Sequence, residues 1–193
     1  LQKLPLSVHE YTRLHEHGFA VLTEYLEMMS HALPSYTREE VRFEGVLATG
    51  DPDFPEVRLT GALDRLDFDA PPHEQGTLLR VVDYKSGKPK TRGQIEGTTK
   101  DSDGNYKRQL VFYALLLSLQ DDVRIHTRTF TLSFLESEKG KIREESYSIT
   151  DEEIASLKEE IIRIVHDITH GTFLTAPCDP EKSNYCHLVA LRQ

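Results

Sequence analysis

The sequence has no tryptophan, only two cysteines and no long apolar run. The cysteines, Cys178 and Cys186, are too few for a disulfide framework, so they do not indicate an oxidising compartment. A membrane-spanning helix needs roughly 18 or more consecutive apolar residues, and no segment of the chain reaches that length. No signal-peptide pattern is found at the start of the chain. These absences together predict a cytoplasmic protein with no membrane partner.

Positive charge is also scarce. The 193 residues carry a formal net charge of −9 with a pI near 5.5, whereas nucleic-acid binding depends largely on cations that neutralise phosphates. Residues 85–108 are the exception, because they contain seven basic and three acidic residues and so carry about +4. Two interpretations stay open for this stretch: a solvated loop of mixed charge, or a strip that faces phosphate groups.

The apolar pattern predicts a single α/β domain over residues 1–193, with a mixed β-sheet flanked by helices. Helices are predicted at 9–31, 108–119 and 150–170, the last with a capping box of Thr150 and Glu153. Strands are predicted at 40–48, 57–68, 77–84, 124–136 and 141–149, including two hairpins. Residues 87–105 are predicted to form a long mobile loop, and residues 186–191 a short helix.

Two carboxylates fall in predicted strands, Asp64 in GALDRLD and Asp83 in VVDYKSGK. Side chains at positions i and i+2 of a strand point to the same face, so Asp83 and Lys85 should project together while Tyr84 points the other way. If strands 57–68 and 77–84 pair, Asp64 lies beside Asp83. The pattern therefore predicts two carboxylates and one ammonium in a single cleft.

Hydrolysis of a phosphodiester can use such a group. Two carboxylates and a backbone carbonyl, here that of Tyr84, are hard oxygen ligands for Mg²⁺ or Mn²⁺. A neighbouring lysine can orient the attacking water or help to deprotonate it. An aspartate and a lysine two residues apart are, however, also common as a solvent-exposed ion pair, so the pair alone does not identify a catalytic site.

The three segments GALDRLD, VVDYKSGK and QLVFYA together resemble the RecB-like branch of the PD-(D/E)xK nucleases. The resemblance implies a restriction-endonuclease-like fold, with Asp64 and Asp83 as metal ligands and Lys85 as the catalytic lysine. It also implies that Gln109 and Tyr113, four residues apart on one helix face, lie near the DNA. The basic residues predicted to contact DNA phosphates are Lys88, Lys90 and Lys107.

Two features depart from the pattern of that branch. Its members usually supply a further metal ligand from an N-terminal helix, for which His15, Glu16 and His17 are the candidates here, with His17 preferred. The expectation is that the true ligand helix precedes Leu1, and that the chain is a C-terminal fragment of a larger helicase–nuclease.

The second departure concerns the cysteines. Many relatives hold an iron–sulfur cluster with four thiolates, but when the pattern is aligned on Cys186 the flanking positions are Ser183 and Arg192, and Cys178 is out of register. The sequence therefore argues against an iron–sulfur cluster.

Two functions remain open. The first is a Mg²⁺- or Mn²⁺-dependent DNA exonuclease that acts on single-stranded ends exposed by a helicase, in DNA repair and recombination. The second is a catalytically inactive DNA-binding or scaffolding domain of a helicase–nuclease complex. The chain has no Walker motif, so a helicase motor would have to lie elsewhere in the parent chain or in a partner.

Overall fold

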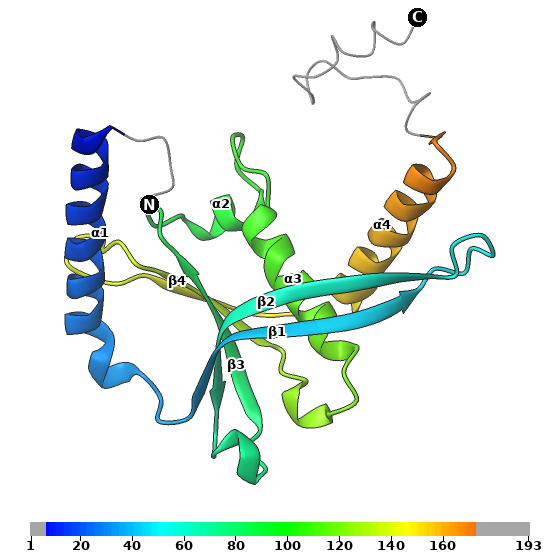
Figure 1. Ribbon diagram of the computed structural model, residues 1–193, viewed down its shortest axis with the longest axis horizontal. Coiled ribbons are helices and arrows are strands. Elements are labelled where there is room, and N and C mark those ends of the chain that lie inside the picture. Colours follow the sequence, from blue (N-terminus) through cyan, green and yellow to red (C-terminus); the bar gives the residue numbers. More distant parts are fainter. Residues whose placement is uncertain (1–6, 173–193) are drawn as a thin grey trace, which may run out of the picture.

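The computed structural model describes residues 7–172, which form a five-stranded mixed sheet with helices on both faces (Figure 1). The strands follow their order in the sequence across the sheet. The helices are α1 (Val8–Met29), α2 (Arg92–Glu96), α3 (Asn105–Ser118) and α4 (Asp151–Thr169). The strands are β1 (Thr37–Ala48), β2 (Glu56–Phe68), β3 (Leu78–Lys85), β4 (Thr129–Phe134) and β5 (Glu144–Ser148). The predicted fold class is confirmed.

The sheet is mixed because one of its four pairings is parallel. Strands β1, β2 and β3 pair antiparallel in succession, and β4 pairs antiparallel with β5. Strands β3 and β4 are parallel, so the chain between them must cross over from one end of the sheet to the other. Helices α2 and α3 lie in that crossover. Strand β3 thus occupies the centre of the sheet.

Helix α3 packs closely against the long β1–β2 hairpin. A Cβ atom added at Gly61 would lie 2.7 Å from Leu116 Cδ1, and one added at Gly45 would lie 2.8 Å from Leu119 Cδ1. Both glycines therefore leave space for the helix. Leu116 of α3 and Val82 of β3 are fully buried.

Helix α1 covers the other face of the sheet. Its one buried residue, Tyr25, lies edge-on to the Tyr84 ring, with 5.9 Å between centroids, and its hydroxyl is 2.9 Å from Ser133 Oγ. In Figure 1, α1 (blue) lies at the opposite side of the molecule from α4 (orange). Most other α1 side chains are exposed, so few contacts attach this helix to the sheet.

The capping box predicted at Thr150 and Glu153 is confirmed. The prediction of a long mobile loop at residues 87–105 is wrong in its centre, where α2 forms. Thr91 and Gln94 form a capping box of their own, and Ile95 is fully buried against the core. A helix start signal and one apolar anchor therefore order a segment whose polar composition suggested a loop.

The second hairpin is shorter than predicted. Residues 124–136 and 141–149 were expected to be strands, but β4 and β5 span only six and five residues. The chain before β4 forms a 3₁₀ turn at Val123–Ile125, because Asp122 caps it by accepting a hydrogen bond from the Arg124 N–H. The short helix predicted at 186–191 and both cysteines lie outside the described residues.

Candidate active site

The structure brings Asp64 and Asp83 together across β2 and β3. The last paired residues of these strands are Arg65 and Val82, so Asp64 and Asp83 occupy the next opposed positions. The Tyr84 N–H donates a hydrogen bond to Asp64 Oδ2 at 2.8 Å, which fixes that carboxylate against the end of β3. The predicted arrangement of the two strands is confirmed.

A closed ring of polar contacts links β3 to α3. Lys85 Nζ lies 2.6 Å from Asp83 Oδ2 and donates to Gln109 Oε1 at 2.6 Å. Gln109 Nε2 donates to the Tyr113 hydroxyl at 2.6 Å, and that hydroxyl donates to Asp83 Oδ1 at 3.0 Å. Each of the four side chains is held by two others. The positions of both the carboxylate and the ammonium are therefore fixed before any ligand binds.

Burial shapes the electrostatics of this ring. Asp83 is only 2% exposed, and its burial raises the pKa of its carboxyl group. The Lys85 ammonium opposes that rise, while the negative charge of Asp64 adds to it. Burial also raises the pKa of the Tyr113 hydroxyl, so Tyr113 stays a proton donor. Burial and the Asp64 charge thus disfavour the ionised form of Asp83, an effect that a bound cation would oppose.

The side chain and the backbone of Tyr84 point in different directions. Its side chain lies on the α1 face beside Tyr25. The N–H and C=O of a strand residue point to the same edge of the strand, and the Tyr84 N–H points to Asp64. The Tyr84 carbonyl is therefore directed to the edge of β3 that faces Asp64, where the sequence predicted a third oxygen ligand.

A comparison of the sequence with models of known protein families identifies its family. The model described as "PD-(D/E)XK nuclease superfamily" matches residues 3–191. The chain belongs to the PD-(D/E)XK nuclease superfamily. A search of curated proteins gives no match. Among solved structures, the chain is similar to one titled "Crystal structure of SSO0001", with 15% identity and a TM-score of 0.40. The alignment covers 81% of this chain and 58% of that one, so the chain spans less than two thirds of that structure.

PD-(D/E)XK membership indicates a nuclease. Asp83 and Lys85 have the spacing that the family name describes, and the structure places them on one face of β3. No helix within residues 7–172 is long and apolar enough to cross a membrane.

The three predicted DNA-contacting lysines occupy different environments. Lys88 is exposed just beyond β3. Lys90 Nζ lies 4.1 Å from the centroid of the Tyr106 ring, which Lys85 Nζ also approaches, at 4.7 Å. Tyr106 thus places a second ammonium next to the Asp83–Lys85 pair. Nothing in the sequence pattern singled out Tyr106, although it lies three residues before Gln109, one turn earlier on α3.

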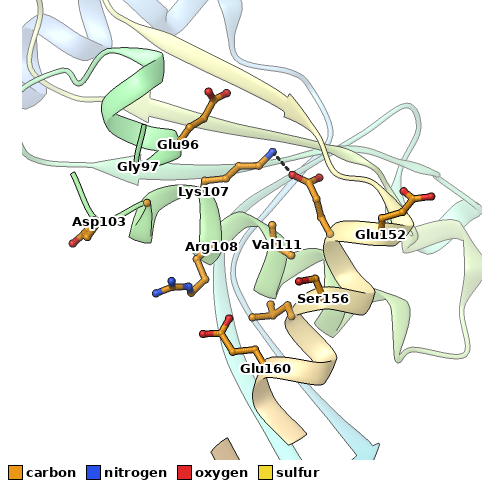
Figure 2. Close-up of a pocket in the computed structure, with 12 residues that line it drawn as sticks. Glu96, Gly97, Asp103, Lys107, Arg108, Val111, Glu152, Ser156 and Glu160 are labelled. Atoms are coloured by element: carbon orange, nitrogen blue, oxygen red, sulfur yellow. Dashed lines mark ion pairs between the residues drawn. The ribbon is translucent and has the colours of Figure 1, made fainter. Parts of the chain in front are cut away.

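Lys107 is not brought to the ring. Its ammonium pairs with Glu153 of α4 at 3.1 Å and lies 4.4 Å from the centroid of the Tyr147 ring. Figure 2 shows this ion pair beside a cavity of about 480 Å³ between α3 and α4. Five acidic residues line that cavity against two basic ones, an environment that repels phosphate. The structure therefore gives Lys107 a role in helix packing.

His17 is not brought to the carboxylate pair either. Its Nε2 lies 3.4 Å from Glu136 Oε1, and its side chain is 58% exposed. Helix α1 reaches the sheet on the face that carries the side chain of Tyr84, whereas Asp83 points to the α3 face. The other candidates, His15 and Glu16, are also exposed, and His15 stacks on Tyr11.

A buried charge network on the α1 face was missed by the sequence prediction. Arg65 is 3% exposed and donates to both oxygens of Asp67, at 2.8 and 3.2 Å. Arg80 donates to the same carboxylate at 2.7 Å, and Arg65 also donates to the Tyr84 hydroxyl at 2.5 Å. The alternation Arg65, Asp67 within β2 was the available signal, because it places both charges on one face.

Proposed function

We propose that this PD-(D/E)XK domain is a Mg²⁺- or Mn²⁺-dependent deoxyribonuclease whose active centre comprises Asp64, Asp83 and Lys85. The closed ring of Asp83, Lys85, Gln109 and Tyr113 carries this proposal. The ring fixes the carboxylate and the ammonium relative to each other, and Asp64 occupies the opposed position on β2. Preorganised charged groups beside a second carboxylate are what phosphodiester hydrolysis requires.

The residues present fit a hard divalent cation. Asp64 and Asp83 occupy opposed positions on β2 and β3, and the Tyr84 carbonyl is directed to the same edge. Burial raises the pKa of Asp83, and the negative charge of Asp64 adds to that rise. Oxygen ligands of this kind select Mg²⁺ or Mn²⁺ over softer metals. When bound, such a cation supplies charge neutralisation at the scissile phosphate and acidifies a nearby water.

Lys85 is placed to hold the attacking water. A lysine ammonium has three donor protons, and two of them are directed to Asp83 and Gln109. The third remains for the water or for a phosphate oxygen. Tyr113 and Gln109 act as positioning residues, because they reach the reacting atoms only through Asp83 and Lys85.

Lys88 and Lys90 are proposed to contact phosphates of the substrate strand. Both follow Lys85 within five residues, and Lys90 lies on the Tyr106 ring that also contacts Lys85. The finer proposal, exonuclease action on single-stranded ends in repair or recombination beside a helicase motor in the same or a partner chain, rests on the resemblance of the three motifs to the RecB-like branch.

The test is a cleavage assay on the full natural chain that contains this sequence, with 5′-labelled single-stranded DNA, duplex DNA and RNA, and with Mg²⁺ or Mn²⁺. Lys85→Ala should abolish cleavage and leave Mn²⁺ binding nearly unchanged. Lys85→Arg should also be poor, since a guanidinium cannot replace a compact ammonium. Lys141→Ala, an exposed lysine in the turn between β4 and β5, is the matched control and should cleave normally.

Metal binding is measured separately by calorimetric titration of Mn²⁺. We expect a site that disappears in Asp83→Ala and persists in Lys85→Ala. Normal DNA degradation by the Lys85→Ala chain would show that this is not the nuclease centre, and the alternative of an inactive DNA-binding domain would replace the proposal.

A further inference from the structure

A second group of metal-ligand side chains lies far from β3, where the loop of the β1–β2 hairpin meets the end of α4. Ligand atoms of Asp51, His166 and His170 all lie within 4.8 Å of one another. Asp51 comes from the hairpin loop, and both histidines come from the last turns of α4. Figure 1 shows the hairpin loop (cyan) extending to the side of the molecule where α4 (orange) ends.

The loop fixes the direction of the Asp51 carboxylate. Asp51 Oδ1 accepts a hydrogen bond from the Asp53 N–H at 2.9 Å, and the Asp51 N–H donates to Thr49 Oγ1 at 3.1 Å. The other oxygen, Oδ2, lies 3.7 Å from His170 Nδ1. The Asp51 side chain is only 14% exposed. One carboxylate oxygen is thus left directed at the histidine pair.

The helix places the two imidazoles side by side. His166 and His170 are four residues apart, so they share one face of α4, and their rings stack with 4.2 Å between centroids. His170 Nδ1 lies 3.1 Å from the His166 carbonyl oxygen. His170 Nδ1 is also 3.1 Å from Thr169 Oγ1. Either ring nitrogen of His170 can be the metal ligand, depending on the tautomer, since Nδ1 faces Asp51 Oδ2 and Nε2 faces Asp53 Oδ2.

A second carboxylate lies at the same place, because His170 Nε2 is 3.9 Å from Asp53 Oδ2. Two carboxylates beside the histidine pair favour a cation between them. The negative end of the α4 dipole is located at the same place and also favours positive charge. A cavity of about 410 Å³ adjoins the group and leaves room for an ion with its water.

We propose that Asp51, His166 and His170 form a second metal site, one that binds Zn²⁺ or a similar transition-metal ion. Two imidazole nitrogens with one carboxylate oxygen are a common zinc ligand set, and the fourth position is open to water or to Asp53. The nuclease centre, in contrast, offers only oxygen ligands and prefers Mg²⁺ or Mn²⁺. The two sites therefore differ in metal preference, and the second ties the hairpin loop to α4.

The first experiment titrates Zn²⁺ into metal-stripped protein that carries Asp83→Ala, which removes the nuclease centre as a competing site. We expect one equivalent of bound Zn²⁺. His166→Ala and His170→Ala should each weaken that binding by at least about tenfold. His15→Ala, an exposed α1 histidine, is the matched control and should not change it. Co²⁺ should give visible absorption bands with the Asp83→Ala protein. These bands should be lost when His166→Ala or His170→Ala is added.

A second measurement tests the proposed link between loop and helix. Zn²⁺ should slow amide hydrogen exchange in residues 49–55 and 162–170, and excess EDTA should reverse the effect. The same protection must be missing in His170→Ala. Circular dichroism establishes that each variant is folded, which is expected because both histidines are exposed.

Two results would overturn the proposal. One is that the Asp83→Ala protein binds no Zn²⁺ when the ion is in 100-fold excess over protein, in which case the group is only a set of His–Asp ion pairs. The other is that binding survives both histidine variants but disappears in Cys178→Ser/Cys186→Ser, which would assign the zinc to the cysteines. Either result leaves the proposed nuclease function unaffected, since that function is tested with Lys85.

Discussion

The two faces of the sheet at β2 and β3 carry opposite balances of buried charge. On the α1 face, the single carboxylate of Asp67 contacts two guanidinium groups, those of Arg65 and Arg80. On the α3 face, Asp83 contacts one ammonium, that of Lys85, and the negative charge of Asp64 acts on it as well. Alternate residues of β2 and β3 form the two faces, so the same backbone carries both charge networks.

The pKa shifts follow that difference. Burial alone would lower the pKa of Arg65, but Asp67 and Tyr84 together raise it by more. For Asp83, burial and the Asp64 charge outweigh Lys85, and the pKa of the carboxyl rises. Removing the carboxylate should therefore leave an uncompensated buried cation on the α1 face, whereas on the α3 face it removes a charge that burial disfavours.

Removing Asp67 should therefore have the largest effect on stability. Asp67→Ala leaves Arg65 buried without its carboxylate, which typically costs about 3–5 kcal/mol for a buried pair. Urea unfolding of metal-free protein measures this loss. Asp101→Ala, at an exposed position, is the control and should change stability by less than about 0.5 kcal/mol. A small loss in Asp67→Ala would mean that the α1-face network does not hold the sheet.

Asp83→Asn should behave in the opposite way. In the absence of metal at neutral pH, it should leave stability unchanged or raise it by up to about 1 kcal/mol, because it removes a charge that its surroundings disfavour. The folded-state pKa of Asp83 is raised, so the native state binds this proton more tightly than the unfolded chain. The wild-type protein should therefore be least stable, relative to Asp83→Asn, at pH values above the raised pKa of Asp83.

That difference should shrink as the pH falls through the raised pKa towards the ordinary value of 3.8, because wild type then becomes neutral at this position as well. Urea unfolding at a series of pH values in EDTA measures the trend. If Asp83→Asn instead loses as much stability as Asp67→Ala, the two faces do not differ in the way proposed.

The smallest effects are expected for lysines around the α3 face. Lys88→Ala and Lys90→Ala should each reduce the salt dependence of DNA binding by about one unit of slope, with cleavage preserved at saturating DNA. Lys107→Ala should leave the slope unchanged, since its ammonium is paired with Glu153. Fluorescence anisotropy at several salt concentrations measures all three. An equal change of slope in Lys107→Ala would indicate that the DNA also passes over the α3–α4 cavity.

Strand pattern was enough to predict the centre of the candidate site. Alternation along β3 predicted that Asp83 and Lys85 share a face, and the four-residue spacing predicted that Gln109 and Tyr113 share one. Both arrangements are confirmed because they depend only on local geometry. The roles of these residues in metal binding and cleavage stay predictions.

What the sequence did not predict depends on contacts between distant elements. The pairing of Lys107 with Glu153 requires α4 to lie beside α3, and the Asp51–His166–His170 group joins residues more than 100 positions apart. The spacing of His166 and His170 was visible in the sequence, but its partner was not. The placement of α1 depends on one buried residue, Tyr25, so the helix pattern alone could not show which side chains face the sheet.

The parallel pairing of β3 with β4 has a consequence for how the domain folds. Val81 pairs with Phe130, and the segment between them contains α3 with Gln109 and Tyr113. Closing a chain segment of this length costs entropy before the parallel contacts repay it, so pairings of this kind form slowly. Hairpins such as β1–β2 connect neighbouring residues and can form early. The ring around Asp83 joins β3 to α3, which lies within this crossover, so we expect the ring to form as the crossover packs against the sheet.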